Sequence, residues 1–142
     1  MNYVAGFMFS ADKKHVALIK KGKPDWQKGK LNGIGGKIEE GEFAYEAMTR
    51  EFKEETGVET DYDQWRHFLT MNGSGWQVMF FCAVGDLEEL ETQEEEPVVV
   101  IEVSSVTADR TEDMIENLPW LIPLAIDSMA DGRPTFSTIQ YP

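Results

Sequence analysis

One segment, residues 42–56, constrains the fold of this chain most strongly, because its apolar residues recur at the spacing of a helix. At about 100° per residue, Ala44, Met48 and Phe52 fall on one arc, which must face a hydrophobic core. Gly57 follows at the position where helices commonly end in a left-handed residue. The segment is therefore predicted to be an amphipathic helix that packs against other elements of the chain.

Three glutamates share this apolar arc: Glu51, Glu54 and Glu55. Glu51 and Glu55 stand one turn apart, so their charges repel on any helix, and burial of an unpaired carboxylate is costly. Two interpretations are open. Either the helix lies at the rim of a cleft, where water solvates the glutamates, or a hard divalent cation such as Mg²⁺ compensates their charge.

A glycine-rich stretch, residues 32–37, precedes the helix and reads Asn-Gly-Ile-Gly-Gly-Lys. Glycines let the backbone come close to a ligand, although they can also serve only a tight turn. The sequence contains neither the GxxxxGK[ST] phosphate loop nor the GxGxxG pattern. Nucleotide binding by those two loops is therefore not supported.

Hydrophobic patterning elsewhere predicts strands, a second helix of about residues 118–130, and a loop over residues 21–36. The strands are expected at residues 3–9, 15–20, 65–70, 77–84 and 98–103. This irregular order favours an α/β fold with a mixed sheet and a helix on each face. With 142 residues, 42% of them hydrophobic, we expect one domain over residues 1–142.

The net charge of −13 disfavours binding to a nucleic-acid polymer, whose phosphates a strongly acidic protein repels. Lysines gather in the first 37 residues, where they suit the far end of a small phosphorylated ligand. No apolar run is long enough to span a bilayer, and we see no secretory signal. Cys82 is the only cysteine, lies in an apolar strand and is expected to be buried. We expect a cytoplasmic protein without a membrane partner, either a monomer or a homodimer.

The helix and its flanks also match a known motif. The pattern Gly36-x5-Glu42-x7-Arg50-Glu51-Phe52-x-Glu54-Glu55-x-Gly57-Val58 resembles the Nudix box, GX5EX7REUXEEXGU, in which U is a bulky aliphatic residue. Phe52 is the one departure, and we expect it to alter packing rather than chemistry. The motif covers about a sixth of the chain, and the strand order is also similar to the Nudix-type α/β/α sandwich with its mixed sheet.

This resemblance implies that a water activated by Mg²⁺, for which Mn²⁺ can substitute, hydrolyses a nucleoside diphosphate linked to another moiety. Glu51, Glu54 and Glu55 match the metal-binding glutamates of the box, and the carbonyl of Gly35 stands where a further ligand is commonly supplied. Many members add a carboxylate from a later loop, for which we choose Glu96 from the three glutamates that precede Pro97.

The resemblance also assigns catalytic roles, which fall to Arg50, Glu51, Glu54 and Glu55. Arg50 is expected to hold the glutamates in place through Glu46 and Glu54, each four residues away. Which glutamate acts as general base varies across the family, and we favour Glu51.

For the substrate, residues 29–37 resemble the MutT-like branch, which removes oxidised purine triphosphates. We assign five residues to substrate binding: Asn32, Gly36, Lys37, Glu116 and Asn117. An amide both donates and accepts hydrogen bonds, so Asn117 suits a purine edge, but it is equally a good N-cap for the helix that follows. Trp120 is expected in the core.

The first hypothesis is a Mg²⁺-dependent hydrolase that converts a nucleoside triphosphate, including oxidised purines such as 8-oxo-dGTP, to a nucleoside monophosphate and pyrophosphate. One alternative keeps the chemistry and changes the substrate to a nucleotide sugar or a capped RNA 5′ end. Another is a nucleotide-sensing module without turnover. The intact set of Glu51, Glu54 and Glu55 favours an enzyme.

Overall fold

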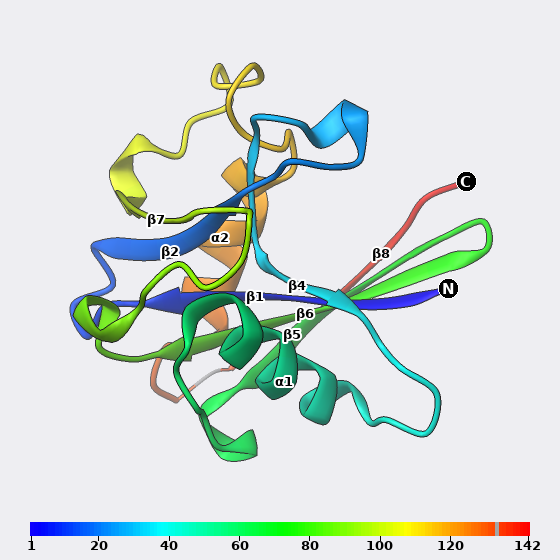
Figure 1. Ribbon diagram of the computed structural model, residues 1–142, viewed down its shortest axis with the longest axis horizontal. Coiled ribbons are helices and arrows are strands. Elements are labelled where there is room, and N and C mark those ends of the chain that lie inside the picture. Colours follow the sequence, from blue (N-terminus) through cyan, green and yellow to red (C-terminus); the bar gives the residue numbers. More distant parts are fainter. Residues whose placement is uncertain (133) are drawn as a thin grey trace.

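The computed structural model describes residues 1–132 and 134–142, and its central element is a mixed sheet with a helix on each face (Figure 1). The helices are α1 (Ala44–Thr56) and α2 (Leu118–Ser128), and short 3-10 turns are η1 (Asp25–Gln27), η2 (Tyr62–Gln64), η3 (Leu87–Glu89) and η4 (Val103–Ser105). The strands are β1 (Asn2–Phe9), β2 (His15–Lys20), β3 (Leu31–Asn32), β4 (Ile34–Lys37), β5 (Arg66–Gly73), β6 (Trp76–Val84), β7 (Val98–Glu102) and β8 (Ser137–Gln140).

Strand β1 organises the sheet because it changes partner along its length. Its last residues, Met8 and Phe9, pair with β2, whereas its first half pairs antiparallel with β4. On its other edge β1 runs parallel to β6. The β5 and β8 strands are also parallel, and the remaining pairs are antiparallel, which confirms the predicted mixed sheet.

Each face of the sheet carries its own hydrophobic core. On one face, Met48 and Phe52 of α1 are fully buried against the sheet, and the Phe52 ring lies 5.1 Å from that of Trp65 in an edge-on contact. On the other face, α2 packs through Leu118 and Leu121. This arrangement confirms the α/β/α sandwich, and it shows that the larger Phe52 is absorbed by packing.

Helix α1 begins two residues later than predicted. The backbone N–H of Phe43, the residue before the helix, donates to the Glu46 carboxylate (3.0 Å), so Glu42 lies outside the helix. At the other end Gly57 has φ of +79° and its N–H donates to the Lys53 carbonyl (2.8 Å), as expected for a left-handed cap.

The predicted loop over residues 21–36 is wrong in part, because it contains β3 and most of β4, and β8 was not predicted. These strands are short, and β4 is half glycine, so they lack the alternation that marks a strand in sequence.

Cys82 is fully buried as expected, and burial raises the pKa of its thiol to about 11. In the part of the chain described, no helix is long and apolar enough to cross a membrane.

Candidate functional site

The glycines of β4 bring its backbone against the acidic face of α1. A Cβ at Gly36 would overlap the Glu51 carboxylate, and one at Gly35 would overlap the Val4 carbonyl of β1. Ile38 N–H donates to Asn2 O, and hydrogen-bonded positions alternate along an antiparallel strand. Gly35, opposite Ala5, is three residues from Ile38, so its carbonyl turns away from β1. The glycines therefore permit a close approach, and the carbonyl of Gly35 is not used in the pairing with β1.

Arg50 donates hydrogen bonds to the carboxylates that lie where β4 approaches α1. Its Nε and Nη2 donate to the two oxygens of Glu42 (2.7 and 3.0 Å), and its Nη1 donates to Glu51 Oε1 (2.9 Å). Nη2 also donates to the carbonyl of Lys37 (3.1 Å), which ties α1 to the end of β4. Glu54 is a weaker partner, at 3.4 Å from Nη1.

The predicted contact between Arg50 and Glu46 is therefore wrong. Glu46 accepts from the backbone of Phe43 instead, and the main partner of Arg50 is Glu42, which precedes the helix. The hydrogen bond from Arg50 holds the pKa of Glu42 below its ordinary value.

Glu51 and Glu55 are carboxylates whose surroundings disfavour negative charge. Burial raises the pKa of Glu51, against the opposing hydrogen bond from Arg50. Burial also raises the pKa of Glu55 to about 7, with further contributions from the neighbouring carboxylates of Glu96, Glu51 and Glu94. Among residues 1–132 and 134–142, Glu55 Oε2 is buried with no hydrogen-bond partner. Glu55 is thus a desolvated acceptor beside other acids.

Glu96 lies beside Glu55, and the loop after β2 holds its side chain in place. Its carboxylate accepts from the Gly22 N–H (2.6 Å) and from Lys21 Nζ (3.2 Å). Burial alone would raise the pKa of Glu96, but these hydrogen bonds bring it below its ordinary value. The structure thus places our chosen acid beside Glu55, in an ion pair with a lysine that sequence reasoning did not single out.

The donor set of this acidic cluster, Glu51, Glu54, Glu55 and Glu96 with the Gly35 carbonyl, suits a hard divalent cation. Oxygen ligands are those that Mg²⁺ prefers, and a cation would give the partnerless Glu55 Oε2 a ligand while relieving the repulsion that raises its pKa. Glu54 is the exposed member, with 49% of its side chain accessible against 14% for Glu51. In the described residues no three acidic, histidine or cysteine side chains already surround one point, so a cation would have to draw the carboxylates together.

A cavity of about 890 Å³ adjoins the acidic cluster, and all five residues assigned to substrate binding line it, as does Gly35. Lys37 and Gly36 enter it from β4, Asn32 from β3, and Glu116 and Asn117 from the segment before α2. The structure therefore brings together residues that lie up to 85 positions apart in sequence (32 and 117).

The two asparagines differ in how their side chains are held. Asn32 Nδ2 donates to Gln27 Oε1 (2.9 Å), and its Oδ1 accepts from the Gly33 N–H (2.8 Å). The side chain of Asn117 makes no capping hydrogen bond to α2, and in the described part of the chain its Oδ1 is buried without a partner. The N-cap interpretation of its side chain is therefore wrong; Asn117 lines the cavity, and its Oδ1 is a buried acceptor.

Several cavity residues were missed by sequence reasoning. They are aromatic or lie in the lysine-rich loop, and include Tyr3, Lys21, Trp26, Trp76 and Tyr141. Trp26 is 67% exposed on η1, in the loop that also carries Gln27. An exposed tryptophan is unusual, so Trp26 in a polar loop was a signal that could have been used. Trp120 is half-buried against the core on the α2 face, as expected.

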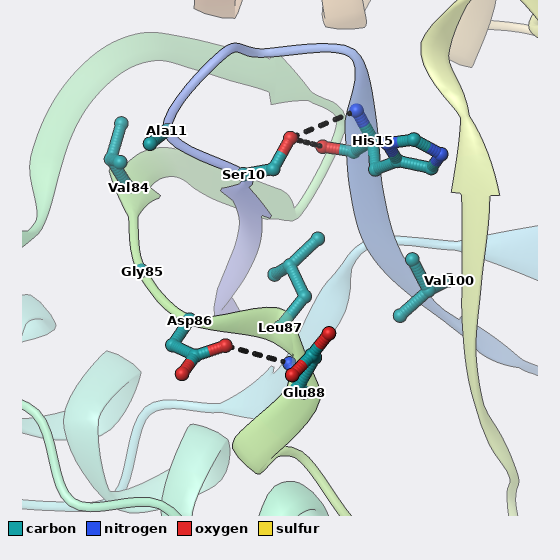
Figure 2. A pocket seen from close by; sticks show the side chains of 9 residues that line it. All are labelled: Ser10, Ala11, His15, Val84, Gly85, Asp86, Leu87, Glu88 and Val100. Atoms are coloured by element: carbon teal, nitrogen blue, oxygen red, sulfur yellow. Dashed lines mark hydrogen bonds between the residues drawn. The ribbon is translucent and has the colours of Figure 1, made fainter.

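A second hollow, of about 670 Å³, lies at the other end of β1 and β6 (Figure 2). Ser10 and Asp86 line it, but their polar groups are already used. Ser10 Oγ is bonded to the backbone of His15, and the Asp86 carboxylate accepts from the Glu88 N–H. None of the predicted site residues lines this hollow.

In metal-free buffer we expect Glu55→Gln to stabilise the protein at pH 8. Folding raises the pKa of Glu55 to about 7, so its contribution to stability is fully present below about pH 4.5 and is lost as the pH rises through 7. Between pH 5 and pH 8 the ionisation of Glu55 should lower the unfolding free energy of wild type by roughly 1 kcal/mol, a value that allows for solvent screening. The unfolding free energy of Glu55→Gln should not show this loss. Thermal melts in EDTA at both pH values measure the difference.

Glu95→Gln is the control, because it removes the same charge from the exposed loop nearby. Adding Mg²⁺ should raise the Tm of wild type more than that of Glu55→Gln. An equal pH dependence in wild type and Glu55→Gln would contradict the assigned environment of Glu55.

Comparison with known proteins agrees with this geometry. Residues 2–121 match the NUDIX domain family. A Caenorhabditis elegans protein provisionally named nudix hydrolase 1 is 37% identical over 100 residues, which cover 66% of this chain and 27% of that relative's own length.

Two solved structures share the fold at low identity. A MutT structure, from a study of the Aliivibrio salmonicida and Vibrio cholerae proteins, is 22% identical, with 89% of this chain and 97% of that chain covered and a TM-score of 0.71. The NUDIX domain of Shewanella oneidensis NrtR, complexed with ADP ribose, is 19% identical, with 92% and 88% covered and a TM-score of 0.71. Because the family match spans most of the chain and includes both β4 and α1, this chain belongs to the NUDIX domain family.

Proposed function

We propose that this chain is a divalent-metal-dependent hydrolase of nucleoside diphosphate-linked compounds. Its first candidate reaction converts a nucleoside triphosphate to a nucleoside monophosphate and pyrophosphate. The observation that carries the proposal is the position of the acidic cluster beside the cavity: Gly35 belongs to both, and Gly36 lines the cavity and lies against the Glu51 carboxylate. A phosphate chain that extends from the cavity toward Gly36 reaches the carboxylates of α1.

The acidic cluster supplies the groups that would hold the metal: Glu51, Glu54, Glu55, Glu96 and the carbonyl of Gly35. When bound, Mg²⁺ or Mn²⁺ lowers the pKa of water and neutralises phosphate charge. Arg50 donates to Glu51 Oε1 and leaves Oε2 of that residue free of Arg50. This oxygen is left to accept a proton, which supports Glu51 as the general base.

Positive side chains line the cavity in a protein that is otherwise acidic. Lys21, Lys30 and Lys37 all contribute to its wall, and each is placed to attract a polyphosphate. These lysines offset part of the repulsion expected from a net charge of −13 at the place where a small anionic ligand would enter. A nucleotide therefore fits the charge distribution better than a nucleic-acid polymer does.

The proposal is tested by incubating the protein and Mg²⁺ with a panel of nucleotides and separating the products by chromatography. The panel holds 8-oxo-dGTP, the common nucleoside triphosphates, ADP ribose and a nucleotide sugar, since a NUDIX domain of the same fold was solved with ADP ribose. A nucleoside monophosphate must appear, and EDTA must abolish it. Tight binding of a nucleotide without any product would instead support the nucleotide-sensing alternative.

Substitution of Asn117 by Ala is expected to alter discrimination between bases. If the partnerless Oδ1 of Asn117 reads a purine edge, its loss costs about 1 to 3 kcal/mol, so kcat/KM for the best purine triphosphate should fall roughly 5- to 150-fold. A poor pyrimidine triphosphate should change little, because it does not use this contact. The measurement is the ratio of kcat/KM among 8-oxo-dGTP, dGTP, dATP and dCTP.

Because the side chain of Asn117 does not cap α2, the variant should keep its thermal stability within about 1 kcal/mol of wild type. Asn32→Ala is the companion variant, and it also frees Gln27. A uniform fall for all four substrates, or no fall for any, would remove Asn117 from base recognition.

A further inference from the structure

The start of β1, the start of β6 and the end of β8 lie on the same side of the sheet as the two chain termini (Figure 1), and each carries an aromatic residue. These residues are Tyr3 on β1, Trp76 on β6 and Tyr141 directly after β8, and all three line the cavity of about 890 Å³. Side chains two residues apart on a strand share a face. The residues two positions along from these three pack against the core on the α2 face: Ala5, Val78 and Ile139.

Trp76 lies flat on this face because its partner across the hairpin has no side chain. Gly73 pairs with Trp76, and a Cβ at Gly73 would overlap the indole ring. The indole therefore extends across β5 toward the next strand, where its ring centre lies 5.9 Å from that of Tyr141. Glycine at position 73 is what lets the two aromatic rings meet.

Tyr141 is held in place by the strand before it. β8 runs parallel to β5, from Leu69 opposite Ser137 to Asn72 opposite Gln140, and the Tyr141 N–H donates to the Asn72 carbonyl (2.8 Å). The side chain nevertheless keeps 39% of its surface exposed. Both β8 and Tyr141 lie beyond residues 2–121, the part that matches the family, so this wall of the cavity belongs to the chain's own C-terminal segment.

We propose that Trp76 and Tyr141 form an aromatic platform that stacks against the base of the nucleotide, which makes β8 a specificity-determining element. The inference rests on the proposed function in taking a nucleotide as the ligand. The platform residues carry no charge, whereas the lysines that suit phosphates enter the cavity from β4 and from the loop after β2. A flat π-system is the part of a nucleotide that aromatic rings bind, while Asn32 and Asn117 line another part of the same cavity.

The test measures binding of GMP and of ribose 5-phosphate by calorimetry in Mg²⁺. Ribose 5-phosphate keeps the sugar and phosphate but has no base. Trp76→Leu, which keeps an apolar side chain over Gly73, should weaken GMP binding about 5- to 150-fold, the range that corresponds to loss of one base–aromatic stack in single-stranded nucleic-acid complexes. Tyr141→Ala should weaken it on the order of 3- to 10-fold, and Tyr141→Phe less than twofold. Ribose 5-phosphate should bind all of these proteins as it binds wild type.

Phe136→Ala is the matched control. Phe136 is an exposed aromatic of the same C-terminal segment that contacts His67 and does not line the cavity, so GMP binding should not change. Thermal melts show whether each variant is folded.

Unchanged GMP binding in Trp76→Leu, equal losses for GMP and ribose 5-phosphate, or no binding of GMP to wild type would overturn the platform. Hydrolysis is assayed separately: a wild type that binds GMP in this pattern but hydrolyses no nucleotide contradicts the proposed function and leaves the platform supported.

Discussion

Replacement of Glu54 by Gln is expected to lower kcat by at least about 100-fold, which corresponds to roughly 3 kcal/mol of transition-state stabilisation. Glutamine keeps the shape of the side chain but removes the charge that would bind the metal. Glu54 is half exposed and makes only a long contact with Arg50, so its replacement should leave the fold intact. The measurement is kcat at saturating Mg²⁺ with the best substrate of the panel, alongside the Tm in metal-free buffer.

Glu46→Gln is the matched control on the same helix. It removes the same charge, and its amide oxygen can still accept from the Phe43 N–H, as the carboxylate of Glu46 does. Its kcat should stay within about twofold of wild type. Turnover of Glu54→Gln within about threefold of wild type would exclude Glu54 from the metal site.

The long elements of the fold were predictable because their own residues specify them. Helix α1 and the strands β1, β2, β6 and β7 have clear patterns, and the irregular order of elements already favoured a mixed sheet. By contrast, the two residues of β3 are a strand only through their partners, which are β2 and the segment before α2. Leu31 N–H donates to the carbonyl of Asp113, and its own carbonyl accepts from Ile115 N–H. Such pairings come from tertiary contacts, which a local pattern does not contain.

The acidic cluster was predictable from helical spacing, but the exposure of its members was not. Glu51 and Glu54 share the apolar arc, yet β4 covers only Glu51, because Gly36 lets that strand approach the helix there. The partner of Arg50 was mispredicted for a related reason. Helical spacing favoured Glu46 and Glu54, whereas Glu42 lies before the helix begins, in a segment that folds back over Arg50. The aromatic wall was not predictable at all, since it depends on β8 pairing with β5.

Replacement of Arg50 by Met is expected to reduce both stability and turnover. The side chain of Arg50 is 24% exposed, and its guanidinium bonds two carboxylates, Glu42 and Glu51, whose side chains are 13% and 14% exposed. Removing it leaves two poorly solvated carboxylates unpaired, which should cost about 3 kcal/mol of unfolding free energy. The hydrogen bond from Arg50 to the Lys37 carbonyl is lost as well, so Glu51 is no longer held against β4. The kcat should therefore fall at least about 30-fold.

Arg50→Lys tests whether the positive charge of Arg50 is sufficient or whether its hydrogen-bond geometry is also needed. Lysine keeps the positive charge but cannot donate to both oxygens of Glu42 and to Glu51 together, so stability should recover more than turnover does. Lys53→Met is the control, because Lys53 lies on the same helix and its exposed ion pair with Glu59 should contribute less than about 1 kcal/mol. Urea unfolding gives the stabilities, and kcat is measured well below each Tm so that unfolded protein does not contribute. If Arg50→Lys restored turnover fully, the charge of Arg50 alone would suffice, and the bidentate contact with Glu42 would have no part in positioning Glu51.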